Sequence, residues 1–185
     1  MSAPVRTVTG TNFAVIADCH IHPGGGPEFP PIVLAALADS HLIVTLGDMG
    51  ETAGLDQLEA IAPVVGVRGQ DDVADPRTEP HVLLLKAGDQ KIGCVFNAVD
   101  AGLASSSDPF TPEPDMAAVA RRLFGADIDI LLHASTHKPA SDAFGQGGQA
   151  LNPGSAVLPA AGAAPTFARL VLEDGRFKSE IVFVG

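Results

Sequence analysis

Short apolar segments alternate with segments of helical composition in the first part of this chain, and each apolar segment stops at polar residues. Compact apolar runs that end at polar or glycine residues are typical of buried strands. The predicted strands are Phe13–Ala17, Leu42–Leu46 and Pro63–Val67, and the predicted helices between them are Pro31–Asp39 and Gly54–Ala62. This βαβαβ pattern predicts parallel strands, which present ligands at their carboxyl ends.

The second half of the chain predicts a different arrangement, in which neighbouring strands pair as hairpins. Gly88-Asp89 and Asp174-Gly175 are turn signals between apolar strands. The predicted elements of this half are the hairpin strands His81–Ala87 with Lys91–Phe96 and Thr166–Glu173 with Phe177–Val184, the helix Met116–Phe124, the strand Ile128–Leu132 and a proline-rich loop from Ser105 to Asp115. We therefore predict an α/β fold with two mixed sheets flanked by helices, in a single domain spanning residues 1–185.

The charge balance excludes two classes of partner. The chain has 11 lysines and arginines against 22 aspartates and glutamates, a formal net charge of −11. Nucleic acids and anionic membrane surfaces both require clustered basic side chains, so we expect neither as a partner. Cys19 and Cys94 are too few for a disulfide framework, the first residues lack the layout of a signal peptide, and no apolar run approaches about 18 residues. We therefore expect a cytoplasmic protein without a membrane segment.

Acidic and histidine side chains gather where predicted strands end. Asp18 and His20 follow the first strand, Asp48 follows the second, and His137 follows Ile128–Leu132. If the extended backbone continues past the first strand, Asp18 and His20 point to the same side and can hold one ion. Two carboxylates and two imidazoles form a donor set that suits Mn, Zn, Fe or Ni. A pair such as Asp18 and His20 alone is also typical of a turn or cap, so the metal hypothesis depends on all four residues.

Five short motifs follow one another along the chain. They are Asp18-Cys-His20, Leu46-Gly-Asp48, Val67-Arg-Gly-Gln-Asp-Asp72, Ser135-Thr-His137-Lys-Pro139 and Asn152-Pro-Gly-Ser155. In this order they resemble the calcineurin-like metallophosphoesterases, in particular the small bacterial and archaeal phosphodiesterases, a branch that includes the retromer scaffold subunit. The resemblance spans roughly residues 13 to 184. It implies a four-layer αββα sandwich that holds two metal ions, a bridging carboxylate, and a bridging hydroxide that attacks a phosphate ester.

The resemblance implies one complete set of metal ligands and one that is replaced. The ligand positions for the first metal are Asp18, His20, the bridging Asp48 and His137, all of which match the family pattern. The private ligand positions for the second metal are occupied here by Gln70, Phe96 and Ser135. A glutamine carbonyl and a serine hydroxyl are weaker ligands than the residues they replace, and phenylalanine cannot coordinate. The pattern therefore predicts one divalent ion, or a second site rebuilt from other groups.

Four further side chains lie close in sequence to these ligands. Arg68 and Lys138 are candidates for contact with a phosphate, although a surface ion pair explains each equally well. His22 and His133 are spare imidazoles that either reach the site or lie elsewhere, His22 in a solvent-facing loop and His133 in the core. Cys19 should face away from its two neighbouring ligands and pack in the core.

Two functions follow from these residues. The first is a metal-dependent hydrolase of a small phosphomonoester or phosphodiester, with Asp48 and His137 as catalytic residues. The second is a catalytically silent protein of the same fold that serves as a scaffold or regulator for a protein partner. The loss of one electrostatic stabiliser costs on the order of a hundred- to a thousandfold in rate, which is compatible with slow hydrolysis or with none. The pattern does not indicate an oligomeric state.

Overall fold

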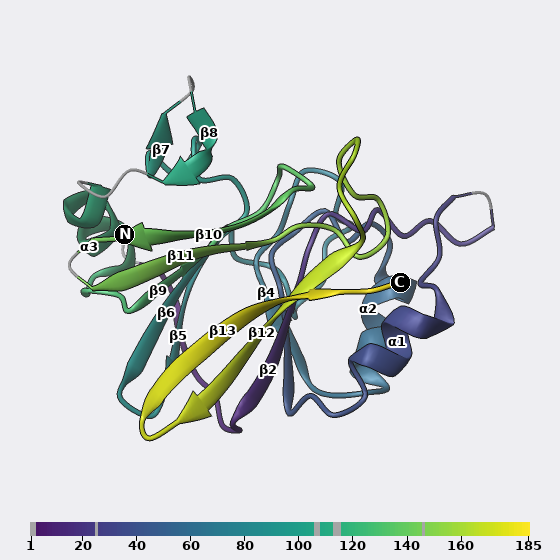
Figure 1. Cartoon of the computed structure of the whole chain (residues 1–185), viewed down its shortest axis with the longest axis horizontal. Coiled ribbons are helices and arrows are strands. Elements are labelled where there is room, and N and C mark those ends of the chain that lie inside the picture. Colours follow the sequence, from purple (N-terminus) through teal and green to yellow (C-terminus); the bar gives the residue numbers. More distant parts are fainter. Residues whose placement is uncertain (1–2, 25, 106–107, 113–115, 146) are drawn as a thin grey trace.

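Two sheets packed face to face form the centre of the molecule (Figure 1). The computed structural model describes residues 3–24, 26–105, 108–112, 116–145 and 147–185. In these residues one sheet has five strands, in the order β13-β12-β2-β3-β4. Their bounds are Asn12–Ile16 (β2), Leu42–Thr45 (β3), Val64–Gly66 (β4), Thr166–Glu173 (β12) and Arg176–Phe183 (β13). Strands β2, β3 and β4 are parallel, as the βαβαβ pattern predicts, whereas β12 is antiparallel to both β2 and β13.

The other sheet has, within the described ranges, six strands in the order β1-β5-β6-β9-β11-β10. Their bounds are Val5–Thr7 (β1), Val82–Ala87 (β5), Gln90–Val95 (β6), Ile130–Leu132 (β9), Pro139–Phe144 (β10) and Gly148–Pro153 (β11). Strands β5 and β6 form the predicted antiparallel hairpin, and β10 pairs with β11 in the same way. Strand β9 is parallel to both β6 and β11, so this sheet is also mixed.

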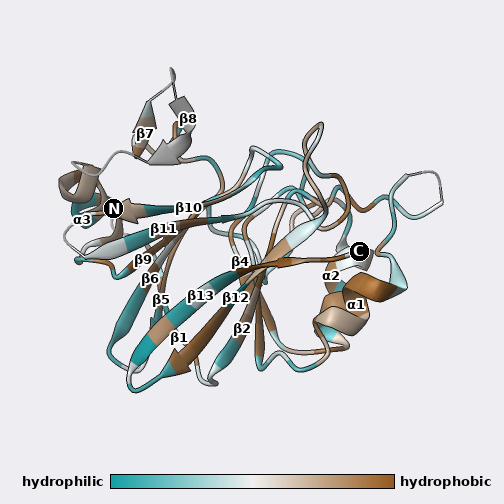
Figure 2. Ribbon diagram, viewed as in Figure 1, coloured by the Kyte–Doolittle hydropathy of each residue, from teal (hydrophilic) through white to brown (hydrophobic). Residues whose placement is uncertain are grey.

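The apolar core explains why the central strands are continuous apolar runs in the sequence. Phe13 and Val15 of β2 lie in the core between the two sheets, whereas Ala14 and Ile16 lie in the core on the opposite face of β2. Successive side chains of a strand point to opposite faces, so both faces of β2 are buried. Hydrophobic residues also run along β12, whereas the outer strand β13 carries many hydrophilic residues (Figure 2).

Helices cover the outer face of each sheet. Helices α1 (Pro31–Ala36) and α2 (Thr52–Glu59) pack Val33 and Leu58 against the five-stranded sheet, and α3 (Ala117–Phe124) packs Phe124 against the six-stranded sheet. The result is the four-layer αββα sandwich that was expected (Figure 1). No helix in the described parts of the chain is long and apolar enough to cross a membrane.

The predicted elements are all present, but several strands were not anticipated. Strands β1, β10 and β11 were missed. Strands β1 and β10 lie at sheet edges and alternate exposed with half-buried residues, which removes the apolar signal. Strand β11 lies inside the sheet, but its sequence begins with glycine and ends in Asn152-Pro153, which resembles a turn. The loop expected from Ser105 to Asp115 is wrong in part: β7 (Ala104–Ser105) pairs with β8 (Asp108–Pro112) in a short antiparallel ribbon. Residues 106–107 and 113–115 of that loop lie outside the described residues.

Candidate metal and active site

The loops that follow β2, β3 and β9 meet at one end of the two sheets, and they carry the residues selected from the sequence. The amide of His20 donates to the carbonyl oxygen of Asp48 at 2.9 Å, so the loops after β2 and β3 lie side by side. The loop after β9 joins them because the amides of Ser135 and His137 donate to the carboxylate of Asp18 at 3.2 and 3.0 Å. The fold therefore brings the four candidate ligands into one place.

These residues have a backbone conformation that side chains other than glycine rarely adopt. Six non-glycine residues among those described have a positive φ, and the five at this site are Asp18 (53°), His20 (48°), Asp48 (50°), Ser135 (72°) and His137 (55°). The extended backbone expected at Asp18 and His20 is therefore wrong, because the chain turns at both residues as their amides bond to the neighbouring loop. Such conformations cost about 1–3 kcal/mol each and are typical of functional sites.

Two imidazoles face each other at the centre of the site. The rings of His20 and His137 are stacked with centroids 5.2 Å apart, and their Nε2 atoms are 3.4 Å apart. His137 Nδ1 lies 2.6 Å from the carbonyl oxygen of Leu158, which can only accept, so Nδ1 carries the proton. His20 Nδ1 lies 2.7 Å from Oδ2 of Asp71 and donates to it in the same way. A ring that carries a proton on Nδ1 alone has its lone pair on Nε2, and the Nε2 atoms are the ones through which the two rings approach each other.

Two carboxylates accompany the imidazoles. Asp18 is fully buried, and this burial raises its pKa to about 6, an effect that hydrogen bonds from the His137 and Ser135 amides partly oppose. Asp48 accepts the amide of Asp71 on Oδ1 at 2.8 Å, and its Oδ2 lies 3.7 Å from Nε2 of His20. A buried carboxylate is costly to ionise unless a positive charge lies close to it. The site therefore has the electrostatic character of a cation site.

The donor atoms fit a divalent ion, although they do not yet form a complete coordination sphere. Facing lone pairs repel unless a proton or a cation lies between them, and nitrogens bound to a tetrahedral zinc ion at about 2.0–2.1 Å lie about 3.3–3.4 Å apart. The separation of the two Nε2 atoms, 3.4 Å, matches this value. Across the described ranges, no group of three or more His, Cys, Asp or Glu side chains has the geometry to hold an ion as it stands. A complete coordination sphere therefore requires side chains of the site to move closer together.

Comparison with known proteins identifies the family of the chain. A sequence model of the calcineurin-like phosphoesterase superfamily domain matches residues 12–175. The chain belongs to this superfamily. A probable metallophosphoesterase of Methanocaldococcus jannaschii is 31% identical over 148 residues, which are 78% of this chain and 68% of that protein.

Two solved structures show that the fold is shared with other proteins. Wild-type Vps29 of Entamoeba histolytica, crystallised in complex with Zn²⁺, is 24% identical with a TM-score of 0.65, over 94% of this chain and 99% of that one. A predicted phosphoesterase of Streptococcus pneumoniae is 19% identical with a TM-score of 0.62, over 94% of this chain and 89% of that one. The similarity to both proteins extends over nearly all of the four-layer sandwich.

Asp71 connects the metal-ligand candidates of this calcineurin-like phosphoesterase to an outer histidine. Its Oδ2 lies 2.7 Å from Nδ1 of His20 and 3.0 Å from Nε2 of His22, and the hydrogen bond with His20 is the main reason that the pKa of Asp71 is lowered. His22 in turn lies 3.7 Å from Glu51, and its pKa is raised chiefly by the hydrogen bond with Asp71. His22 therefore touches the partner of a candidate ligand. Sequence reasoning missed Asp71, although it follows β4 as Asp48 follows β3.

Asp72 fastens the loops of the phosphoesterase site to one another. Its Oδ1 accepts the amides of Met49 and Gly50 at 2.6 and 3.0 Å, and its Oδ2 accepts the amide of Gly69 at 2.7 Å. Burial raises the pKa of Asp72, although these three N–H groups partly oppose the shift. This carboxylate holds the loop after β3 against the loop after β4, a role that sequence reasoning did not assign to it.

The Asn152-Pro-Gly-Ser155 motif supports both ends of the ligand set. Ser155 Oγ donates to the carbonyl oxygen of Asp18 at 2.7 Å and accepts the amide of Leu158 at 2.8 Å, and the carbonyl of Leu158 in turn accepts from His137. Asn152 Nδ2 donates to Thr136 Oγ1 at 3.1 Å. The motif is therefore a support for the site, and none of these contacts requires it to touch a substrate.

Two candidates from the sequence lie in the core rather than in the site. His133 is fully buried, with Nδ1 3.5 Å from Nδ2 of Asn152, and burial lowers its pKa to about 4. Cys19 is also fully buried, and its thiol donates to the carbonyl oxygen of Ala17 at 3.3 Å. Both residues thus have the core positions that were among the expectations for them.

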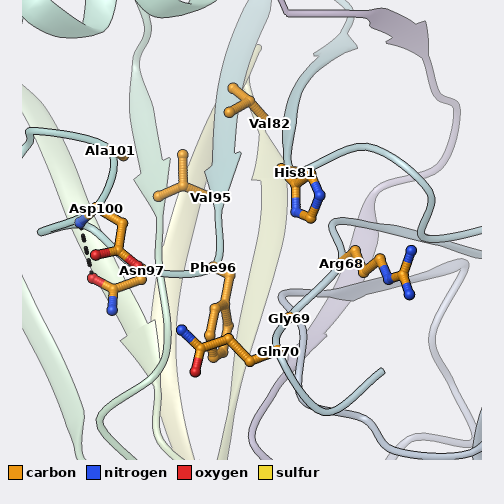
Figure 3. A pocket seen from close by; sticks show the side chains of 10 residues that line it. All are labelled: Arg68, Gly69, Gln70, His81, Val82, Val95, Phe96, Asn97, Asp100 and Ala101. Carbon is orange, nitrogen blue, oxygen red and sulfur yellow. Dashed lines mark hydrogen bonds between the residues drawn. The ribbon is translucent and has the colours of Figure 1, made fainter. Parts of the chain in front are cut away.

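Three residues, Gln70, Phe96 and Ser135, stand where the superfamily pattern has ligands of the second metal. They lie in two different parts of the structure. Ser135 contributes its amide to Asp18, whereas Gln70 and Phe96 line a cavity of about 620 Å³ that Arg68 also lines (Figure 3). Phe96 is buried, and a Cβ placed on Gly47 would lie 2.8 Å from its ring. The ring therefore packs directly beside the loop that carries Asp48. Arg68 Nη2 donates to the carbonyl oxygen of Asp72 at 3.2 Å, and its guanidinium points away from Phe96 and Gln70 (Figure 3).

Proposed function

We propose that this chain is a metal-dependent phosphoesterase that hydrolyses a small phosphomonoester or phosphodiester. The observation that carries the proposal is the pair of facing Nε2 atoms of His20 and His137, 3.4 Å apart, with each Nδ1 proton taken by a separate acceptor. Two such lone pairs require a proton or a cation between them, and superfamily membership supports a divalent metal in that role. Asp18 and Asp48 supply the negative charge that would balance the ion.

The side chains of the site have distinct parts in this proposal. A bound divalent ion lowers the pKa of water and polarises a phosphoryl oxygen. His137 and Asp48 act as catalytic residues by holding the ion where the ester must lie. Asp71 and the carbonyl of Leu158 keep the Nδ1 protons in place, so that both Nε2 lone pairs stay directed at the ion. Arg68 is available to contact a phosphate oxygen from the side of the cavity.

We assign one ion to the site. Phe96 carries no donor atom, and Gln70 and Ser135 offer weaker ligands than imidazoles. The nitrogen and oxygen donors suit Mn, Zn, Fe or Ni, and the Zn²⁺ complex of the fold neighbour Vps29 supports an ion of this class. Without a second ion the site lacks a clamp on the leaving oxygen, which costs on the order of a hundred- to a thousandfold in rate. We therefore expect slow turnover.

A second candidate function is a silent scaffold or regulator that binds a protein partner. Two observations favour it. The fold is shared with Vps29, which is called Vacuolar Protein Sorting 29 in the structure from Cryptosporidium parvum, and Phe96 is buried beside the site. The two functions differ in one measurable respect, which is turnover that depends on the metal.

The test is a measurement of metal content and hydrolysis on the purified wild-type chain. We expect about one equivalent of a divalent metal, and hydrolysis of bis-p-nitrophenyl phosphate or p-nitrophenyl phosphate that stops on chelation and returns with added Mn²⁺. Retention of no metal under saturating conditions contradicts the ligand set. One bound metal without turnover above the chelated protein contradicts the hydrolase and favours the scaffold.

The hydrogen bond from His20 to Asp71 gives a second prediction. Asp71→Asn leaves the backbone N–H that Asp48 accepts in place but removes the carboxylate that orients the imidazole. We expect the affinity for Mn²⁺ or Zn²⁺ to fall about 10- to 100-fold, measured by competition with a chromophoric chelator. Glu51→Gln is the matched control, because Glu51 contacts His22 and not His20. Equal affinities of the two variants would show that Asp71 does not position this ligand.

A further inference from the structure

The cavity beside Asp48 has the size and position of a substrate pocket. Its volume of about 620 Å³ lies within the range of roughly 300–1,000 Å³ that small-molecule sites occupy. Gly69 lines it, and a Cβ on Gly69 would lie 2.2 Å from the amide nitrogen of Asp48. Phe96 lines it as well and packs against Gly47. The wall of the cavity and the loop of the candidate metal ligands are therefore in direct contact.

The lining of the cavity combines apolar and amide side chains. Val82 and Val95 line one part of it and Phe96 lines another, where the amide of Gln70 lies next to the Phe96 ring (Figure 3). Asn97 Oδ1 accepts the amide of Asp100 at 3.2 Å, so its Nδ2 is the atom that this side chain offers to a ligand. A pocket of this kind selects a flat apolar group that carries a hydrogen-bond acceptor on its edge.

The formal charges of the cavity lining cancel, so the lining has no net attraction for a charged group. Arg68 contributes one positive charge and Asp100 one negative charge, so the lining is balanced with His81 neutral. The phosphate itself belongs beside Asp48 and His137, where a cation would balance it. The cavity is therefore suited to the part of the substrate that carries no charge.

We infer that this cavity binds the alcohol half of the phosphate ester, and that this half is an uncharged aromatic group. The inference rests on the proposed function, because the phosphate is taken to lie at the metal site. It adds a substrate class: esters of aromatic alcohols, whose ring packs against Phe96 while Gln70 and Asn97 bond to its edge. Phe96 and Gln70, which stand at metal-ligand positions of the family pattern, then have a function of their own because they shape the pocket.

The test compares two esters with leaving alcohols of similar acidity, benzyl phosphate and ethyl phosphate, on the metal-loaded chain. We expect kcat/KM for benzyl phosphate to be at least about tenfold higher, because the ring is removed from water in the cavity. Ala101→Phe places a large side chain at the cavity wall and should abolish this preference while ethyl phosphate turnover stays within about twofold. Ala38→Phe, at an exposed position after α1, is the matched control and should keep the preference.

The outcomes separate this inference from the proposed function. Equal kcat/KM for the two esters, or an equal loss for both in Ala101→Phe, overturns the inference and leaves the hydrolase intact. Hydrolysis of neither ester, together with no hydrolysis of bis-p-nitrophenyl phosphate, overturns the proposed function instead. In that case calorimetric titration of the same chains with benzyl and ethyl phosphate tests ligand binding in the cavity without hydrolysis. Tighter binding of benzyl phosphate that is lost in Ala101→Phe supports the inference. Equal binding of the two esters overturns it.

Discussion

His137→Ala should lower kcat/KM for bis-p-nitrophenyl phosphate by about a thousandfold and reduce the bound metal well below one equivalent. His137 supplies one of the two Nε2 atoms that face each other at 3.4 Å. The amide of residue 137 still donates to Asp18 in the variant, so the loop keeps its main anchor. Metal content by mass spectrometry and steady-state hydrolysis measure the two effects.

Two further variants show whether such a loss comes from the imidazole itself. His137 has a φ of 55°, a conformation that asparagine tolerates better than alanine, so His137→Asn should lose activity while keeping the melting temperature of the wild type. His41→Ala removes an exposed histidine whose Nδ1 contacts the amide of Thr11, and it should leave metal content and turnover unchanged. The hydrolase fails if wild type and His137→Ala turn over at the same rate.

Asp72→Ala should lower the free energy of unfolding by about 4 kcal/mol. The substitution leaves the amides of Met49, Gly50 and Gly69 without their acceptor, and an unpaired buried N–H costs about 1–3 kcal/mol. Part of this cost is offset, because burial raises the pKa of Asp72 and the ionised carboxylate is itself held at some expense. Urea unfolding of the metal-free chain measures the change without a contribution from bound ion.

A matched control distinguishes the loss of the three hydrogen bonds of Asp72 from the loss of any single hydrogen bond. Asp129 is exposed and accepts a single amide, that of Lys91, at 2.8 Å, so Asp129→Ala should cost only about 1 kcal/mol. Asp72→Asn keeps one acceptor oxygen and should fall between the two alanine variants. If Asp72→Ala and Asp129→Ala unfold at the same urea concentration, the loops after β3 and β4 do not depend on this carboxylate.

Much of the fold was predictable because buried elements have recognisable apolar patterns in the sequence. Strand β2 is buried on both faces and reads as a continuous apolar run, and α3 ends at Gly125, whose left-handed conformation closes the helix. Strand β10 is an edge strand with alternating exposed residues and begins at Pro139, so its sequence resembles a loop. Local pattern therefore identified most strands of the core and missed the edge strands β1 and β10 together with the interior strand β11.

The site was predictable to the extent that ligands follow strand ends. Asp18, Asp48 and His137 were selected on this ground, and the fold places them together. The turned backbone at Asp18 was not predictable, because it is imposed by hydrogen bonds to a loop distant in sequence. Asp72 was missed for the same reason. Its three partners are backbone amides, and because every residue type except proline has one, the sequence does not indicate them.

The contact between His20 and His137 joins positions 117 residues apart in the chain. Closing a loop of this length costs conformational entropy that only the packing of both sheets offsets, so contacts of this kind form late in folding. The two histidines therefore meet only after β2 and β9 have taken their places in different sheets. Occupancy of the site by an ion would thus report the completely folded chain, and partly folded or truncated chains should take up metal far more weakly.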